Sequence, residues 1–394
     1  MRGTSLNFSK AKRLGKLPPY LFAELDRRKR KLKEKGIDLI DLGVGDPDVP
    51  TPSPIVARLV EAAKDSCNYR YPSYEGLLSF REEVSRWYLR RFGVSLEPEK
   101  EVVTLIGSKE GIAHVSLGLL DAGDLALIPE PGYPVYQAGA VFAGAEPFYM
   151  SLKEDNGFLP CLQDIPSHVA SRAKLMWLNY PNNPTGASVE IDFFQEVVEF
   201  AYNFNIIICH DLAYSELSYD DYRAPSFLQV DGAKEIGVEF HSLSKSFCMT
   251  GWRIGYAVGS KDLLDALKEV KTNVDSGVFQ AIQEAGIEAL RLQENLIPEI
   301  REIYRKRRDF FVQGLRDLGW ETSLPRATFY LWIKVPGGYS SFDFTQILLE
   351  RCGIVVTPGV GFGPSGEGYI RVALTVDEKR LKEALDRLEE LKLE

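Results

Sequence analysis

The chain has 394 residues, of which 45% are hydrophobic and 26% charged, a composition typical of a globular protein with about two domains. Its formal net charge is −9, from 47 basic and 56 acidic residues, and this acidic balance argues against a nucleic-acid partner. No run approaches the roughly 18 apolar residues of a transmembrane helix, and the N-terminus lacks the apolar region of a signal peptide. We therefore expect no membrane partner.

The five cysteines contain no CxxC pair, so neither a metal centre nor a disulfide framework is expected. An odd number of scattered cysteines is compatible with a reducing compartment, which favours a cytoplasmic protein.

The N-terminal part predicts a helix over 21–35, a short strand over 37–42 and helices over 55–63 and 77–92. A basic run at 27–31 suggests either a nucleic-acid patch or a solvated helix face, and the net negative charge of the chain favours the solvated face.

The middle of the chain alternates short apolar runs with helical stretches. Apolar strands separated by helices predict an α/β domain with a mostly parallel sheet that is covered on both faces. Such sheets collect ligands at the carboxyl ends of their strands. The predicted strands are 102–106, 125–128, 175–178, 206–209, 238–241 and 254–258.

After about residue 280 the pattern changes, with predicted helices over 281–293 and 297–318 and predicted strands over 329–334 and 369–374. A capping box at 375–378 opens a last helix, whose stripe of leucines predicts a core face. This stripe consists of Leu381, Leu385 and Leu388. We expect three parts: a segment of residues 1–45 that joins a small α+β domain, a large domain over 46–280, and the small domain over 281–394.

The most informative lysine, Lys245, directly follows a predicted strand and lies near Ser242 and Arg253. A partly desolvated lysine beside a fixed cation can have a lowered pKa and form an imine with an aldehyde. The serine hydroxyl and the planar arginine suit a phosphate dianion. Aldehyde and phosphate on one small molecule describe pyridoxal 5'-phosphate (PLP). The alternative is an ordinary lysine in a surface loop.

Other strand ends carry polar or aromatic residues. Ser108 and Lys109 begin a helix, whose free amide groups favour a phosphate, although Ser108 would also suit a plain helix cap. Tyr133 could stack on a planar ring or pack in its turn. Asn183 lies in an unusual proline-rich turn over 179–186 that would project an amide side chain.

Asp211 ends a predicted buried strand, where a carboxylate is costly unless a cation meets it. A protonated pyridine nitrogen would be such a cation, and the pairing would keep the ring an electron sink. The alternative for Asp211 is a helix N-cap. Tyr214 could donate to the ring oxygen, whereas His210 and His241 are interpreted as core residues.

In their order and spacing these motifs resemble the class I and II aminotransferases of PLP fold type I, over nearly the whole chain. The resemblance implies a three-layer fold with a mostly parallel central sheet plus a smaller α+β domain. It also implies a homodimer with active sites shared between subunits, and amino-acid and keto-acid substrates.

The resemblance further implies a role for each motif. Lys245 would join the cofactor and move the substrate proton, Asp211 would pair with the pyridine nitrogen, and Tyr133 would stack on the ring. Asn183 and Tyr214 would hold the ring hydroxyl. The implied phosphate ligands are Ser108, Lys109, Ser242, Arg253 and Tyr71 of the partner subunit. The implied substrate-binding residues are Tyr20, Gly45, Glu75, Lys109, Asn183 and Arg371, with Gly45 and Arg371 at the α-carboxylate.

Within this family, the strings at 17–22, 43–48, 107–111 and 276–280 resemble the LL-diaminopimelate aminotransferases. That likeness implies amino transfer from LL-2,6-diaminopimelate to 2-oxoglutarate, giving tetrahydrodipicolinate and glutamate, a reaction of lysine biosynthesis. Glu75 from the partner subunit is the candidate for the distal substrate end. Alternatives are a broader aspartate or alanine aminotransferase, a PLP β-lyase, or a PLP-binding regulator, for whose DNA-binding module the N-terminus is too short.

Overall fold

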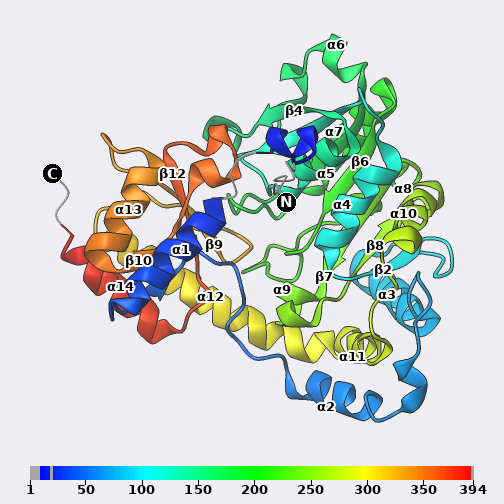
Figure 1. Cartoon of the computed structure of the whole chain (residues 1–394), viewed down its shortest axis with the longest axis horizontal. Helices are drawn as coiled ribbons and strands as arrows, with labels where there is room; N and C mark the ends of the chain where they lie inside the picture. Colours follow the sequence, from blue (N-terminus) through cyan, green and yellow to red (C-terminus); the bar gives the residue numbers. More distant parts are fainter. Residues whose placement is uncertain (1–8, 18–20, 392–394) are drawn as a thin grey trace, which may run out of the picture.

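The computed structural model describes residues 9–17 and 21–391. Its centre is a seven-stranded sheet with the order β2-β8-β7-β6-β5-β3-β4 (Figure 1). Only β8 runs antiparallel to its neighbours in this sheet, so the predicted mostly parallel sheet is confirmed. The strands are β2 (Val102–Leu105), β3 (Leu125–Glu130), β4 (Glu146–Ser151), β5 (Ala173–Leu178), β6 (Ile207–Asp211), β7 (Gly237–Ser242) and β8 (Gly255–Gly259).

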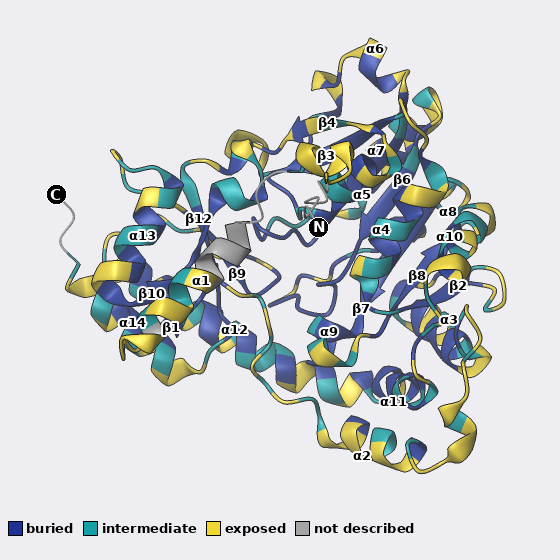
Figure 2. Cartoon of the chain, viewed as in Figure 1, coloured by how far each residue is buried: buried dark blue, intermediate teal, exposed yellow. Residues whose placement is uncertain are grey.

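Helices cover both faces of this sheet, as the burial of strands such as β2, β3 and β7 shows, since successive side chains of a strand point to opposite faces. Figure 2 shows the buried strands between partly exposed helices. One apolar core lies under α4 (Ser108–Leu119), α5 (Val135–Ala143) and α10 (Lys261–Val274). Another lies under α3 (Leu78–Phe92), α7 (Ile191–Phe204) and α11 (Gln280–Arg291). The result is a three-layer α/β architecture.

The two apolar clusters that flank the sheet belong to the core of the three-layer part. A second core, outside these layers, joins the two ends of the chain. The strand β1 (Ile40–Asp41) pairs in parallel with β10 (Ile354–Val355), and β9 (Tyr330–Lys334), β12 (Tyr369–Ala373) and β11 (Thr357–Pro358) form an antiparallel sheet. Around them pack α13 (Ser341–Cys352), α14 (Glu378–Glu389) and the C-terminal half of α12 (Gln293–Asp317). The predicted leucine stripe of α14 is buried in this core.

Several predicted elements differ from the observed ones. The edge strand β4 was not predicted: it contains Pro147, which disfavours a strand interior, and most of its residues are exposed or only partly buried. The helix α12 begins at Gln293 rather than 297 and contains Pro298, which forgoes one hydrogen bond near the helix start. The predicted capping box is wrong: Asp377 caps α14 by accepting from Arg380, whereas Thr375 donates to the Val44 carbonyl at 2.7 Å.

The remaining described helices are α1 (Leu21–Glu34), α2 (Ser53–Ala62), α6 (Ser167–Ala170), α8 (Ala233–Ile236) and the single turn α9 (Leu243–Ser246). None of the helices in the described part of the chain combines the length and apolar character needed to cross a membrane.

Candidate active site

A cavity of about 380 Å³ lies where the carboxyl ends of the central strands face the second core. Residues that are distant in the sequence meet there, because β6, β7 and α4 start or end at this edge while β9 and β12 approach from the opposite side. The predicted site residues that line this cavity are Gly45, Ser108, Lys109, Tyr133, Asn183, Asp211, Tyr214, Ser242, Lys245, Arg253 and Arg371.

Lys245 lies in α9, immediately after β7, and is partly buried. Its Nζ donates to the carbonyl oxygen of Gly45 at 2.7 Å. Burial lowers the pKa of this amine to about 8, although the negative charge of Asp46 opposes the shift and the guanidinium of Arg371 reinforces it. An amine with this pKa is partly neutral near pH 7, so it can act as a nucleophile or as a base.

Asp211 ends β6 and presents one carboxylate oxygen to the cavity. Its Oδ2 accepts from the Tyr136 hydroxyl at 2.8 Å, and its backbone oxygen accepts from Asn179 at 2.7 Å. Its Oδ1 is buried and has no hydrogen-bond partner among residues 9–17 and 21–391. Burial raises the pKa of Asp211 to about 6. A buried oxygen without a donor fits a cationic N–H group of a ring, which would pair with it and restore the ionised state.

One end of the cavity concentrates positive charge at the start of α4. Gly107 adopts the left-handed φ of 74°, and a Cβ there would lie 2.2 Å from Arg253, so glycine allows this close approach. Burial and the nearby Arg253 lower the pKa of Lys109. Ser108 begins α4, where free amide groups point outward. Two cations beside a helix N-terminus fit a phosphate group.

Ser242 belongs to the same end of the cavity. Its hydroxyl oxygen caps α9 by accepting from the Ser244 amide at 3.2 Å, which places it beside the start of this turn. Tyr133 lies nearby, at the end of the turn that precedes α5, and the Lys109 Nζ lies 5.7 Å from the centre of the Tyr133 ring.

The opposite end of the cavity holds Arg371, which is only 4% exposed. Its Nη1 donates to Asn183 Oδ1 at 2.8 Å and its Nη2 donates to the Gly43 carbonyl at 2.7 Å. Its Nε has no hydrogen-bond partner, and no carboxylate within the described chain pairs with the guanidinium. A buried guanidinium without an acid fits a substrate carboxylate, which arginine can bind through two parallel hydrogen bonds.

The sequence analysis missed several residues that shape this site. Tyr330 lies on β9, and its hydroxyl is 3.0 Å from the Tyr214 hydroxyl. A Cβ on Gly45 would lie 1.9 Å from the same Tyr330 oxygen, so glycine is needed there. Tyr136 and Asn179 contact Asp211 from α5 and from the end of β5. An available signal was the polar hydroxyl of Tyr136 on the buried face of a mostly apolar helix.

Two predicted site residues in the described ranges, Tyr71 and Glu75, do not line the cavity. Tyr71 is 86% exposed, and Glu75 forms ion pairs with Arg81 at 3.5 Å and with Lys268 at 3.7 Å. Tyr20 lies outside the described residues. Within a single chain, therefore, Tyr71 and Glu75 are separate from the groups around Lys245.

The two histidines near the site are core residues, as predicted. His210 Nδ1 lies 2.8 Å from the buried carboxylate of Glu239, and His241 Nε2 contacts the Tyr88 hydroxyl. Neither ring lines the cavity. The pair instead satisfies Glu239, which would otherwise be an unpaired buried charge.

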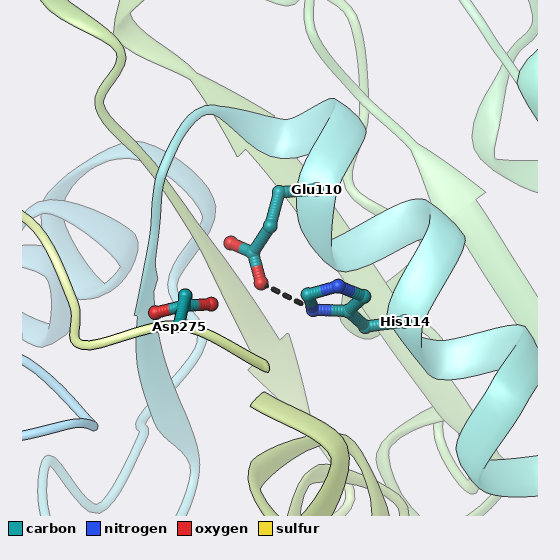
Figure 3. A group of neighbouring side chains, drawn as sticks. All are labelled: Glu110, His114 and Asp275. Atoms are coloured by element: carbon teal, nitrogen blue, oxygen red, sulfur yellow. Dashed lines mark ion pairs between the residues drawn. The ribbon is translucent and has the colours of Figure 1, made fainter. Parts of the chain in front are cut away.

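A separate cluster of acidic and imidazole groups lies between α4, which carries Glu110 and His114, and the end of α10, where Asp275 lies (Figure 3). His114 Nδ1 lies 2.7 Å from Glu110, and the Lys271 ammonium lies 2.8 Å from Asp275 and 3.5 Å from Glu110. Because this ammonium already balances the carboxylates, we assign no metal to the cluster. Glu110 also accepts from the Ile106 amide at 2.9 Å, which anchors the loop before Ser108.

Comparison with known proteins agrees with this geometry. Residues 37–388 match the family described as aminotransferase class I and II. A Moorella thermoacetica protein named LL-diaminopimelate aminotransferase is 55% identical over 96% of this chain and 97% of its own length. An Aquifex aeolicus protein of the same name is 54% identical over 98% of this chain and all of its own length.

Solved structures give the same result. Substrate-bound BacF from Bacillus subtilis is 37% identical, with a TM-score of 0.95 over 98% of this chain and 99% of that one. A probable N-succinyldiaminopimelate aminotransferase from Thermus thermophilus is 39% identical, with a TM-score of 0.89 over 94% and 99% of the two chains. The sequence, the fold and the cavity therefore lead to one conclusion: this chain belongs to the class I and II aminotransferase family, and it is an aminotransferase.

Proposed function

We propose that this enzyme uses PLP to transfer an amino group between LL-2,6-diaminopimelate and 2-oxoglutarate, giving tetrahydrodipicolinate and glutamate. The observation that carries the cofactor assignment is the single unpaired oxygen of Asp211 in the same cavity as the lowered-pKa amine of Lys245. Substrate choice is supported by relatives named LL-diaminopimelate aminotransferase that are 50% to 55% identical over nearly the whole chain.

When bound, PLP supplies an aldehyde that joins an amine and a ring that withdraws electrons from the substrate Cα. The residues of this chain then divide the work. Lys245 would hold the cofactor through Nζ, and the same amine would take the proton from the substrate Cα and give it back. Its position after β7 and its pKa of about 8 suit this shuttle near neutral pH.

The other side chains bind and orient. Asp211 would keep the proton on the ring nitrogen, because its Oδ1 has no other partner within the described chain. Asn183 and Tyr214, which line the cavity, would hold the ring hydroxyl, and Tyr133 would stack on the ring. The phosphate ligands that we propose from this chain are Ser108, Lys109, Ser242 and Arg253.

The α-carboxylate of each substrate would bind Arg371. Its guanidinium is buried and lacks an acid, and the Tyr330 ring lies 4.3 Å from its central carbon, which excludes water on that face. The Gly45 backbone borders the same end of the cavity. These features fix one end of the substrate and leave its distal end to be recognised elsewhere.

We also infer a homodimer in which a second copy completes the site, with Tyr71 of the partner subunit at the phosphate and Glu75 of the partner subunit at the distal substrate end. In support, large apolar side chains are exposed around the loop that carries them. These are Tyr69, Tyr71, Tyr74, Val274 and Phe279. The domain limits at 1–45, 46–280 and 281–394 belong to the same proposal.

The test of substrate choice is a panel of half-reactions. The PLP-loaded enzyme is mixed with LL-diaminopimelate, aspartate, alanine or an aromatic amino acid, and the visible absorbance of the bound cofactor is followed. We expect bleaching by LL-diaminopimelate. Bleaching by alanine or aspartate alone would support the broader aminotransferase instead, and pyruvate release from cystathionine without a keto acid would indicate a β-lyase.

The test of the cofactor site is chemical. Borohydride reduction followed by peptide mapping should place the label on Lys245, and Lys245→Ala should abolish both the label and the visible absorbance. A folded, PLP-supplemented protein without visible absorbance would contradict the proposal.

A further inference from the structure

A second cavity, of about 240 Å³, lies apart from the active site. It is enclosed by the C-terminal end of α3, the segment that follows Asp211, and the first turns of α12. Arginines dominate its lining, together with Gln293 and two glutamates. The arginines are Arg90, Arg91, Arg223 and Arg301.

The positive charge of this pocket is only partly balanced. The buried Glu216 pairs with Arg91 at 3.0 Å, and its backbone oxygen accepts from Arg301 Nε at 3.3 Å. Arg223 and Arg301 form no ion pair with any residue in the described ranges 9–17 and 21–391. Two guanidinium groups of this pocket therefore have no ion-pair partner among the described residues.

The arginines also lie close enough to repel one another. Burial lowers the pKa of Arg301, Glu216 opposes this shift, and Arg91 and Arg223 reinforce it. A bound anion would relieve this repulsion, whereas water relieves it only in part.

Gln293 adds a neutral donor to the same pocket. Its side-chain oxygen accepts from the indole nitrogen of Trp87. An indole N–H can only donate, so the amide orientation is fixed and Nε2 cannot face Trp87. Gln293 is only 7% exposed and lines the cavity, and its Nε2 has no acceptor within the described part of the chain. It is therefore an unpartnered donor in a nearly buried side chain.

We propose that this pocket binds a small dianion, either inorganic phosphate or a short dicarboxylate, through Arg223, Arg301 and Gln293. The positive charge of the two arginines and the N–H donors of all three side chains fit an oxyanion, because an oxyanion forms paired hydrogen bonds with guanidinium groups. The volume of about 240 Å³ limits the ligand to a small ion, because pockets for drug-sized molecules begin near 300 Å³.

The pocket is placed to influence the active site. Glu216 follows Asp211 and Tyr214 on the same buried segment, and Arg301 lies on α12, whose Arg307 binds Asp48 through two hydrogen bonds of 2.6 and 2.8 Å. A bound dianion would tie this segment to α12. We therefore expect bound anion to raise the melting temperature of the enzyme by mass action.

The experiment measures anion binding to the PLP-loaded enzyme by calorimetry, with inorganic phosphate and with succinate in separate titrations at constant ionic strength. Wild type is compared with Arg223→Met and Arg301→Met. The matched control is Arg172→Met, because Arg172 is an exposed arginine outside the pocket. Any anion binding at Arg371 is common to all four proteins and cancels in the comparison.

We expect Arg223→Met and Arg301→Met each to weaken binding by about tenfold or more, as loss of a charged hydrogen bond should, with Arg172→Met unchanged. The anion whose affinity falls more in Arg223→Met shows whether the pocket is built for phosphate or for a dicarboxylate. Arg223 is exposed, so its variant should fold and can decide the matter alone. Equal affinities in wild type and Arg223→Met for both anions would overturn the proposal.

Discussion

The Tyr136 hydroxyl donates to Asp211 Oδ2 at 2.8 Å, which leaves Oδ1 of this cavity-lining residue as the carboxylate oxygen without a partner among the described residues. Tyr136 cannot turn away, because it is fully buried and its ring stacks on Trp177 at 4.9 Å with an interplanar angle of 18°. We interpret Tyr136 as a positioning residue: it does not reach the cavity, but it orients the group proposed to hold the ring nitrogen.

Replacing Tyr136 by phenylalanine tests this role. The hydrogen bond favours the ionised carboxylate and lowers the pKa of Asp211, so its loss should raise that pKa further above about 6. We expect PLP to bind about tenfold more weakly, in line with loss of a hydrogen bond to a charged group. The dissociation constant is measured by absorbance.

The matched control is Tyr222→Phe, which removes a buried hydroxyl that donates to the Val189 carbonyl away from the cavity. Its PLP affinity should equal that of wild type. If Tyr136→Phe also leaves the affinity and its pH dependence unchanged, Tyr136 only fills space.

Asp211 should destabilise the cofactor-free protein above pH 6. Burial raises its pKa from 3.8 to about 6, so the folded state binds a proton that the unfolded state has released. Stability therefore falls as pH rises from about 4 to 6, by roughly 3 kcal/mol at most. Asp211→Asn removes this cost, and we expect the apoprotein variant to melt higher than wild type at pH 8 but not at pH 4.

This comparison uses melting curves of the two apoproteins at both pH values. With PLP added, the order should reverse at pH 8, because only the carboxylate can pair with the ring nitrogen. A pH-independent difference between the apoproteins would show that Asp211 is not the titrating group.

The pKa of Lys245 sets the pH at which cofactor attaches. Burial lowers this pKa to about 8, and only the neutral amine attacks an aldehyde. The rate of PLP incorporation into the apoprotein should rise about tenfold per pH unit below 8 and level off above it. Stopped-flow absorbance at several pH values checks this profile. A plateau reached only near pH 10.5 would mean that the amine is solvated.

Gly45→Ala should damage the substrate end of the cavity. The added Cβ would lie 1.9 Å from the Tyr330 hydroxyl, so the loop or the β9 side chain must move. Because Gly45 also accepts from Lys245, we expect a KM at least about tenfold higher and a loss of about 1–3 kcal/mol in stability.

Steady-state kinetics and denaturant melts measure these two effects. The control is Gly337→Ala, since a Cβ at Gly337 meets no atom within 4 Å. A Gly45→Ala enzyme with the KM of wild type would contradict the close approach of Tyr330.

Sequence patterns predicted the parts of the site that depend on local order. Lys245 and Asp211 follow apolar runs that form β7 and β6, and strand ends of a parallel sheet meet at one edge whatever the surrounding loops do. The likeness to a known family added Arg371, which lies far away in the chain. The placements of Lys245 and Asp211 needed only periodicity and the order of the motifs, whereas Arg371 was found only through the family likeness.

Long-range packing decided the rest. Tyr136 and Tyr330 carry no distinctive pattern, and they became part of the site only when α5 and β9 closed on Asp211 and Gly45. Whether Arg223 and Arg301 have ion-pair partners likewise depends on which acidic side chains lie nearby in space. Local sequence determines where strands and helices begin and end, but side-chain contacts between distant elements depend on how the layers pack, and those contacts determine which polar groups remain unpaired.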